Sequence, residues 1–484
     1  MRTWRRTPLA PVTGLVLLFT AVACTDEPPP EPAGSPSAVP TSYTGAAPPG
    51  LGPSPVRVLH GPGSDGPDIL DDPMGVRFQG VGGSFLISSN SEEHHVLQDA
   101  LDGTALWEGE QRVERFTTDR EGDDVFEVSA RRDGRTVTGV VDDSGARVWS
   151  GSDPRESYLN GWVVRRPEGW SSDDPHGRFS LLDLDGSTVW EFVFEPPADP
   201  EETPGSSTEE EPEEADAEDT GVPVAAHGNV VFLDDGTGQV QARDLDDGGA
   251  LLWRASGTDP QIAGASAFPR PLPEFVGFYD LPLPEGDASA PGSASEAEAT
   301  PTEGEEPPPR TTVLVRWGSD EDPSVLSLHD VHSGEIVWSL TEPGANPADG
   351  DFGPAFVPGT VHDTVTHTLL LPQGSGATPM IAVDLVSGRI RWTFDDETER
   401  SISPAFALGG HVYGDARGAA EDSQVVLGAA DKEISGGGLT GYVEAVTDDG
   451  YALVVQDGQR FVFPPVAGSG PSPTPGRGES TGMH

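Results

Sequence analysis

The stretch AVDLVSGRIRW (residues 382–392) reads as two short strands joined by a tight turn. Apolar residues alternate with polar ones on both sides of the turn, as they do in half-buried strands. The carboxylate of Asp384 can accept hydrogen bonds from backbone amides of the turn, and Gly388 can adopt the positive φ that other residues resist. Trp392 ends the second strand, where its large ring can cover a neighbouring sheet. The stretch therefore predicts a β-hairpin that is stable only beside further strands.

The same pattern occurs five more times along the 484 residues. The copies are LQDALDGTALW (97–107), VVDDSGARVW (140–149), LLDLDGSTVW (181–190), ARDLDDGGALLW (242–253) and LHDVHSGEIVW (328–338). Successive closing tryptophans are 42, 41, 63, 85 and 54 residues apart, and the two shortest intervals match the length of a four-stranded propeller blade. The six copies supply the predicted structural residues of the repeat: Asp99, Gly103, Trp107, Asp142, Gly145, Trp149, Asp183, Gly186, Trp190, Asp244, Gly249, Trp253, Asp330, Gly334, Trp338, Asp384, Gly388 and Trp392.

This repeat resembles the tryptophan-docking repeat of the pyrroloquinoline-quinone-like β-propellers, A-x-D-x-x-[ST]-G-x-x-x-W. Residues 382–392 fit that pattern in full, and the other copies fit at Asp, Gly and Trp. The resemblance covers residues 56–466 and implies an all-β fold, a β-propeller of four-stranded blades.

The blades can be counted along the chain. Six of them carry the motif, residues 403–434 read as a seventh blade that has lost its Trp, and residues 442–463 supply about three further strands. Residues 55–61 precede the first blade and are predicted to pair with this last group, so that the N- and C-terminal strands close the ring. This count gives eight blades, with seven as the alternative, and closure leaves few open sheet edges.

The first residues read as an export signal. A basic segment, MRTWRR, precedes a mostly apolar stretch that ends in Ala21-Val22-Ala23-Cys24. This ending resembles a bacterial lipobox, and it implies a signal peptide over 1–23 and lipidation of Cys24. Cleavage near Ala23 without a lipid is the alternative. Arg5-Arg6 also fits twin-arginine export.

Composition divides the rest of the chain. Residues 24–54 are rich in Pro, Gly, Ser and Ala and are predicted to be a disordered tether. The propeller is predicted over 55–466, with disordered acidic insertions at 195–221 and 284–310, and residues 467–484 are predicted to be a disordered tail. After the signal, no stretch is apolar for the ~18 residues that a membrane-spanning helix needs, so the expected anchor is the lipid alone.

Charge and cysteine content narrow the functional classes. The chain has 81 Asp and Glu against 28 Lys and Arg, a net charge of −53. Such a surface repels phosphate backbones, so nucleic acid is not an expected partner. A single cysteine excludes any intrachain disulfide or multi-cysteine metal site.

Candidate chemistry is sparse. Quinone-dependent dehydrogenases of the family hold their cofactor over a Trp floor beside a vicinal disulfide, together with a calcium ion, and this chain lacks the second cysteine. We therefore expect no cofactor, no resident metal and no catalysis. Weaker candidates for cation binding are adjacent acids, Asp123-Asp124, Asp173-Asp174, Asp234-Asp235 and Asp448-Asp449, and the histidines His94, His95, His329 and His332.

These features predict a lipid-anchored, non-catalytic binding or sensor module at the outer face of the cytoplasmic membrane. Its partner would be a protein or ligand of the cell envelope. The architecture resembles that of the propeller lipoproteins of outer-membrane β-barrel assembly. Two alternatives stay open: a quinone-dependent or other propeller enzyme, and a structural envelope protein whose acidic loops bind cations or wall polymers.

Overall fold

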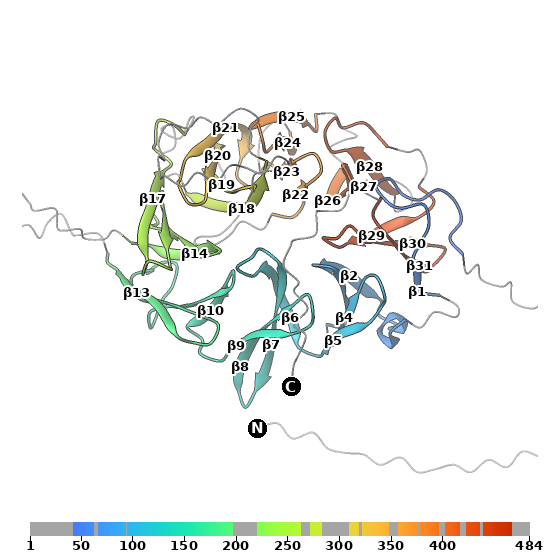
Figure 1. Cartoon of the computed structure of the whole chain (residues 1–484), viewed down its shortest axis with the longest axis horizontal. Coiled ribbons are helices and arrows are strands. Elements are labelled where there is room, and N and C mark those ends of the chain that lie inside the picture. The colour runs from blue at the N-terminus through green and yellow to red at the C-terminus, as the bar shows by residue number, and fades with distance from the viewer. Residues whose placement is uncertain are drawn as a thin grey trace, which may run out of the picture. The chain divides into compact units, whose positions relative to one another are not determined.

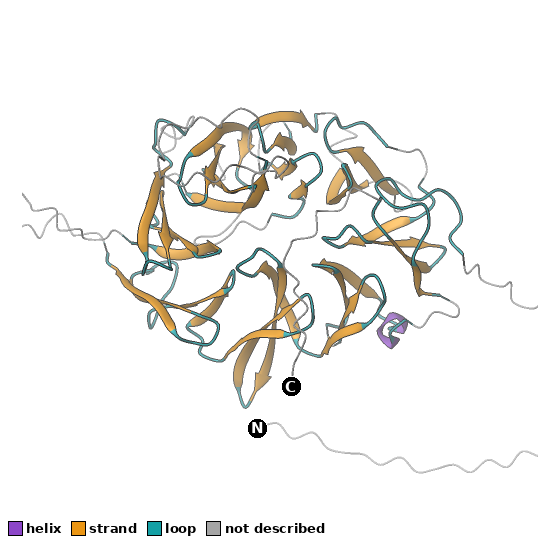
Figure 2. Cartoon of the chain, viewed as in Figure 1, coloured by secondary structure: helices purple, strands orange, loops and turns teal. Residues whose placement is uncertain are grey.

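The computed structural model describes most of the chain between residues 42 and 466. The described ranges are 42–61, 66–92, 94–196, 220–262, 272–282, 309–318, 322–347, 357–374, 378–395, 402–416, 423–435 and 439–466. All of them belong to one compact unit. They fold as β-strands, with one short 3₁₀ helix, η1 (Asp68–Asp71), among them (Figure 2). The predicted all-β class is confirmed. Within these ranges, no helix has the length and apolar character needed to cross a membrane.

The strands of the described chain form eight antiparallel sheets, seven of four strands and one of three. Seven of the sheets are meanders in which consecutive strands pair. Figure 1 shows these sheets, the blades, following one another in chain order around a common centre. The predicted eight-bladed propeller is confirmed, and the seven-bladed alternative is wrong.

Blades 1 to 4 are regular four-stranded sheets, in the order of their strands along the chain. Blade 1 contains β2 (Val76–Val81), β3 (Ser84–Ser89), β4 (His95–Asp99) and β5 (Ala105–Gly109). Blade 2 contains β6 (Arg112–Thr118), β7 (Asp124–Arg132), β8 (Arg135–Asp142) and β9 (Arg147–Gly151). Blade 3 contains β10 (Glu156–Leu159), β11 (Trp162–Arg165), β12 (Gly177–Leu182) and β13 (Thr188–Phe194). Blade 4 contains β14 (Val222–His227), β15 (Val230–Asp234), β16 (Gln239–Asp244) and β17 (Ala250–Ser256).

Blades 5 to 8 include the two irregular ones. Blade 5 contains β18 (Pro273–Leu281), β19 (Arg310–Trp317), β20 (Pro323–Asp330) and β21 (Ile336–Ala345). Blade 6 contains β22 (Val361–Asp363), β23 (Thr368–Pro372), β24 (Met380–Asp384) and β25 (Arg389–Thr393). Blade 7 has three strands, β26 (Ile402–Leu408), β27 (His411–Ala416) and β28 (Ser423–Gly428). Blade 8 contains β29 (Tyr442–Val446), β30 (Ala452–Gln456), β31 (Gln459–Phe463) and β1 (Arg57–His60).

Blade 8 closes the ring with strands from both ends of the described chain. Strand β1 pairs antiparallel with β31, with Arg57 opposite Val462 and Val58 opposite Phe461. On the other side, β29 of the same blade lies against β2 of blade 1. The predicted closure by N- and C-terminal strands is therefore confirmed.

The hydrophobic core lies between blades. Apolar residues alternate along the strands, and their side chains face the neighbouring sheet. Each buried Val, Leu or Phe side chain stabilises the fold by roughly 1.5–3 kcal/mol relative to exposure. One such cluster joins blades 1 and 2 and contains Val81, Leu86, Leu97, Phe126, Val128 and Val141.

Part of the segment predicted as a tether packs on the propeller. Tyr43 places its ring edge against Phe461 and Phe463, at centroid distances of 5.6 and 4.9 Å. Leu51 is buried and bridges to Pro465. A composition poor in apolar residues hides these two contacts from sequence analysis, so the boundary predicted at residue 54 lies too far along the chain.

The other predicted boundaries lie in or beside residues that the structure does not describe, and they stay predictions. Residues 197–219 and 283–308, the bulk of the two predicted acidic insertions, lie outside the described residues, as do the predicted signal peptide, Cys24 and residues 467–484. On the described side, β14 begins at Val222 and β19 at Arg310.

Candidate functional site

The six motif turns share a backbone hydrogen bond, in which the N–H of the motif glycine donates to the backbone oxygen of the motif Asp. The Asp carboxylate accepts backbone amides of its own turn: Oδ1 of Asp384 accepts the N–H groups of Val386 and Ser387 at 3.0 and 3.3 Å. In the same way, Oδ1 of Asp330 accepts the N–H of Ser333 at 2.7 Å. All six motif glycines have a positive φ, between 67° and 86°. These residues therefore shape the turn between the third and fourth strands of each blade.

The motif tryptophans connect each blade to the next. The indole N–H of Trp253 in blade 4 donates to the backbone oxygen of Val331 in blade 5, at 2.8 Å. Trp338 donates to the oxygen of Leu385 at 2.7 Å, and Trp392 to that of Ala429 at 2.9 Å. Val331 and Leu385 directly follow the motif Asp of the next blade.

The motif glycines also leave room for these rings. A Cβ on Gly334 would lie 2.4 Å from Cγ of Trp253, and one on Gly388 would lie 2.5 Å from the ring of Trp338. Trp149 differs, because a Cβ on Gly186 in the next blade would meet nothing within 4 Å. The tryptophans thus pack between neighbouring blades.

Blade 8 has no motif Trp, and Arg57 of β1 takes its place. Its Nε donates to the oxygen of Ala100 at 3.0 Å, and its Nη2 donates to that of Asp99 at 2.9 Å. Ala100 follows the motif Asp of blade 1, so this is the acceptor position that Trp uses elsewhere. A Cβ on Gly103 would also lie 2.8 Å from Nη1 of Arg57. Sequence analysis missed Arg57 because the residue is chemically unlike Trp.

Blade 7 lacks the motif glycine, and Lys432, the one lysine of the chain, stands in its place. Lys432 has a φ of 62°, and its N–H donates to the oxygen of Gly428 at 2.9 Å, as Gly388 donates to Asp384. It therefore occupies the motif glycine position. Its Nζ donates to the oxygen of Thr393, next to the docked Trp392, at 3.0 Å. Alignment of LGAADKEI (427–434) with the repeat would have found this residue.

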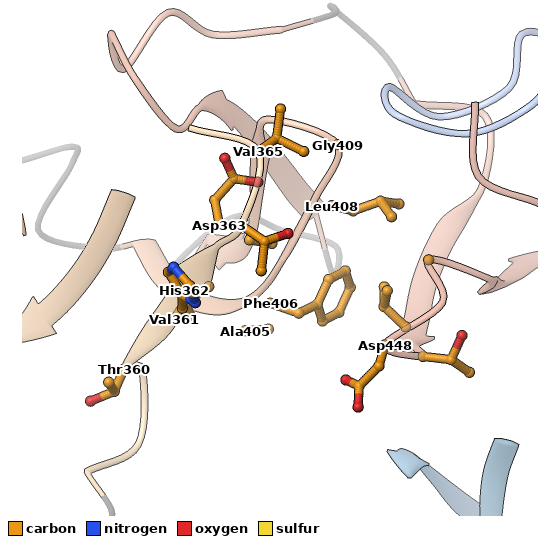
Figure 3. A pocket seen from close by; sticks show the side chains of 15 residues that line it. Thr360, Val361, His362, Asp363, Val365, Ala405, Phe406, Leu408, Gly409 and Asp448 are labelled. Carbon is orange, nitrogen blue, oxygen red and sulfur yellow. The ribbon is translucent and has the colours of Figure 1, made fainter. Parts of the chain in front are cut away.

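A cavity of about 290 Å³ lies where blades 6, 7 and 8 meet (Figure 3). In each of these blades it touches the end of the innermost strand and the turn that follows. Its lining residues are 360–365, 405–409, 446–448 and 450. We define these residues as the inner cavity. No sequence motif marks it, because its residues come from three separate turns.

Asp363 of the inner cavity has a structural role. Its Oδ1 accepts the N–H of Gly410 in blade 7 at 3.0 Å. Its Oδ2 accepts the N–H and the hydroxyl of Thr366 at 2.9 and 2.6 Å. Both oxygens are engaged, so Asp363 joins blades 6 and 7 and is not placed to act as a base.

His362 is the one imidazole of the lining. Burial lowers the pKa of His362 to about 4, so the ring is neutral at pH 7. The ring meets Tyr279 edge-on at 4.9 Å. Its Nε2 is buried and has no hydrogen-bond partner among the residues that the structure describes. This atom is therefore an unused polar group beside the cavity.

Asp448 brings an unusual carboxyl pair to the cavity edge. The N–H of Asp448 donates to the oxygen of Gly82 in blade 1 at 2.9 Å, and the N–H of Gly82 lies 3.4 Å from Oδ2 of Asp124 in blade 2. The two carboxyls are hydrogen-bonded to each other. Partial burial, the charge of Asp124 and this hydrogen bond raise the pKa of Asp448 to about 7.

Two of the predicted acidic pairs thus converge. Asp123-Asp124 and Asp448-Asp449 flank the same turn of blade 1, and Asp173-Asp174 and Asp234-Asp235 lie in blades 3 and 4. Asp234 is buried, and its Oδ1 accepts the N–H of Gly236 at 2.8 Å. Across the described ranges, no three His, Cys, Asp or Glu side chains are arranged to hold a metal ion.

The candidate histidines are placed apart from one another. His329 is buried, bonds Ser327 at 2.7 Å and stacks on Trp253 at 5.3 Å. Burial lowers its pKa to about 4. His94 bonds Glu108 at 2.9 Å, and the buried His95 bonds Ser88 at 2.8 Å. His332 is exposed in the turn after Asp330. The contacts of His94, His95 and His329 are those of structural residues.

The comparisons with known proteins concern the fold. No protein-family model and no curated protein sequence matches the chain. The structure of BamB from Moraxella catarrhalis is 13% identical, covers 80% of this chain and 96% of its own, and has a TM-score of 0.36. Quinohemoprotein alcohol dehydrogenase from Comamonas testosteroni is 13% identical over 83% of this chain and 76% of its own, with a TM-score of 0.38. Sqt1 from Saccharomyces cerevisiae is 10% identical over 80% and 95%, with a TM-score of 0.39. The eight-bladed propeller therefore has both BamB and quinoprotein dehydrogenases among its structural neighbours, and the sheet topology is what establishes its fold.

Proposed function

We propose that this chain is a non-catalytic binding module outside the cytoplasm, which receives its partner at the inner cavity. The observation that carries this proposal is the cavity itself, about 290 Å³ and bordered by turns of three consecutive blades. Concave sites with a few convergent polar groups are the usual binding sites of proteins. In propellers, such turns surround the centre of the ring, where several blades can contact one partner.

The polar groups of the inner cavity support binding better than catalysis. Asp363 is saturated by backbone and hydroxyl donors, so it cannot orient or deprotonate a second group. His362 is neutral and packs against Tyr279. A nucleophile with an adjacent base, which acyl transfer needs, is not found among the described lining residues.

The proposed location rests on the sequence. The segment that ends at Ala23-Cys24 supports lipidation of Cys24 and residence at the outer face of the cytoplasmic membrane. Metabolic labelling with a fatty-acid analogue should mark the wild-type protein and spare Cys24→Ala. An unlabelled wild-type protein would contradict the anchor.

Partner capture tests the binding proposal. Ala405 lines the cavity and is exposed, so Ala405→Trp should fill the space without burying a new group in the core. Ala105, an exposed alanine of outer strand β5, gives the matched control Ala105→Trp. Full-length proteins would be used to capture partners from envelope extracts, with thermal melts to verify folding.

We expect Ala405→Trp to lose the captured partner and Ala105→Trp to retain it. Equal capture by both variants would show that the cavity is not the binding site. Titration with pyrroloquinoline quinone addresses the enzyme alternative. Saturable quinone binding that Ala405→Trp abolishes would overturn the non-catalytic assignment.

A further inference from the structure

The geometry of the inner cavity points to a cationic group as its occupant: we infer that it receives a lysine or arginine side chain of a polypeptide partner. This inference rests on the proposed binding function and names the chemistry that the site would recognise.

The size of the cavity favours a side chain over a cofactor. Its volume of about 290 Å³ falls at the lower limit of the roughly 300–1,000 Å³ typical of small-molecule sites. The three turns that form it belong to consecutive blades, so a chain crossing the centre of the ring can insert one residue between them.

The charge of the lining selects a cation. Its charged residues are Asp363 and Asp448, and no Lys or Arg is among the lining residues. The lining histidine, His362, is neutral because burial lowers its pKa to about 4. Three acids beyond the lining, Asp123, Asp124 and Asp449, add negative potential at Asp448. An anionic occupant would meet only repulsion here.

Asp448 is the accessible carboxylate of this set. The residue is exposed to solvent although its carboxyl is partly buried, whereas Asp363 is buried and saturated. In Figure 3, Asp448 lies across the opening from His362, with the ring of Phe406 between them. A bound ammonium or guanidinium beside Asp448 would relieve the repulsion between that residue and Asp124.

Phe406 gives the cavity a surface suited to an organic cation. Its ring stacks on Tyr413 at 5.4 Å and is half-buried, so it is held in place. A cation over the remaining face of an aromatic ring gains a cation–π interaction.

A metal ion fits the same site poorly. Calcium takes six to eight oxygen ligands and magnesium requires octahedral geometry. Over the described residues, no cluster of three ligating side chains exists. A compact ion would also make no use of the Phe406 ring, whereas a guanidinium would stack on it.

Calorimetric titration with two tripeptides tests the inference. The probes are acetyl-Gly-Arg-Gly-amide and the same peptide with citrulline, which has the shape of arginine without its charge. Full-length wild-type protein at pH 8 should bind the arginine peptide about tenfold or more tightly than the citrulline peptide. Raising the ionic strength should weaken this preference.

Two variants test which residues of the inner cavity bind the arginine peptide. Asp448→Asn keeps a hydrogen-bond donor for Asp124 and removes the charge, and it should lose about tenfold in affinity for the arginine peptide. Phe406→Leu keeps an apolar side chain and removes the ring face, and it should lose a smaller factor. Asp173→Asn, in an exposed acidic pair of blade 3, is the matched control and should bind as wild type.

The pH dependence of peptide affinity distinguishes direct contact with Asp448 from a purely structural role of that residue. Affinity for the arginine peptide should rise as the pH passes through about 7, where Asp448 loses its proton beside Asp124, Asp123, Asp143 and Asp449. Asp448→Asn should abolish most of this rise, and Asp173→Asn should preserve it.

The possible outcomes separate the two proposals. Equal binding of both peptides, or equal affinity in Asp448→Asn and Asp173→Asn, would overturn the cation inference. If Ala405→Trp nevertheless abolished partner capture, the binding function would stand with an occupant of different chemistry. If Ala405→Trp retained capture and no peptide bound, both proposals would fall.

Discussion

Blades 1 to 6 and blades 7 and 8 build the same ring by different means. In the first group, each blade ends in a motif Trp that contacts the next blade, and for four of these tryptophans (Trp107, Trp190, Trp253 and Trp338) a motif glycine of the next blade leaves room for the side chain. In blade 7 the glycine position holds Lys432, and in blade 8 the Trp position holds Arg57. Both cations donate to backbone oxygens beside a docking position. The comparison shows that an arginine can occupy the position of a docking Trp, and that a lysine can occupy the position of a motif glycine.

The inner cavity lies where the regular blade 6 meets the irregular blades 7 and 8. It is bounded by blades 6, 7 and 8, and the carboxyl pair at its edge spans from blade 8 to blade 2. The regular blades therefore serve mainly as a frame, and the region in which the chain closes on itself also carries the candidate site.

Removing a docking Trp should lower the free energy of unfolding more than any other single change proposed for this protein. Trp392→Ala, Trp253→Ala or Trp338→Ala removes a large ring and the hydrogen bond of its N–H, at a cost of roughly 3–5 kcal/mol in the free energy of unfolding. Trp149→Ala should fall at the lower end of that range, since its ring covers no motif glycine. Thermal melts of the single variants measure this, and wild-type melting by all four would contradict the docking role.

Removal of Arg57 should be the next largest effect. Arg57→Ala leaves the backbone oxygens of Asp99 and Ala100 without these donors, at a cost of about 1–3 kcal/mol. Arg57→Trp should recover part of the loss if the position is equivalent to that of the motif Trp. Arg131, exposed near the end of β7, provides the control Arg131→Ala, which should stay within about 0.5 kcal/mol of wild type. An Arg57→Ala variant as stable as this control would show that blade 8 does not need the contact.

Asp448→Asn should change the pH dependence of stability. The folded-state pKa of Asp448 is raised from 3.8 to about 7, so the folded state binds its proton more tightly than the unfolded state does. Wild-type stability should therefore fall as the pH rises from about 4 to about 7 and then level off. Asp448→Asn removes this loss and should be more stable than wild type above pH 7, with no gain at pH 4.

The size of that gain is limited by solvent. Because Asp448 is exposed, water screens its repulsion with Asp124, and a gain of about 1 kcal/mol is expected. Urea melts at pH 4, 6 and 8 measure it, with Asp173→Asn as the control. A gain that is constant with pH would show that the proton equilibrium of this pair is not involved.

The smallest effect concerns Lys432. Its φ of 62° favours glycine, and its side chain compensates through the bond to Thr393. Lys432→Ala loses the bond and keeps the unfavourable φ, whereas Lys432→Gly loses the bond and relieves the backbone. The glycine variant should therefore be about 1 kcal/mol more stable than the alanine variant. Equal melting temperatures for the two variants would mean that residue 432 no longer has a positive φ in the alanine variant.

The sequence predicted the frame better than the site. The Asp, Gly and Trp pattern predicted six blades, because backbone turns and large rings constrain residue type strongly. The other two blades and the closing strand at 55–61 were predicted from strand-like segments without the motif. Arg57 and Lys432 escaped detection because Arg57 replaces a Trp and Lys432 replaces a glycine, and neither residue resembles the one that it replaces. The pairing of Asp124 with Asp448 could not be predicted, since it depends on how the two ends of the ring meet. Tyr43 and Leu51 escaped because two apolar residues in a Pro- and Gly-rich segment give no periodic signal.

Closure of the ring places blade 8 beside blade 1 and so brings the carboxyls of Asp448 and Asp124 together. His60 of β1 lies opposite Arg460 of β31, and the Cα atoms of such antiparallel partners lie within the range that a disulfide spans. In a Cys24→Ser background, His60→Cys with Arg460→Cys should form a disulfide on oxidation, measured as the loss of both free thiols. His60→Cys with Arg147→Cys, which places the second thiol in blade 2, should keep both thiols free. Two free thiols in the first variant under the same conditions would contradict the closed, eight-bladed ring.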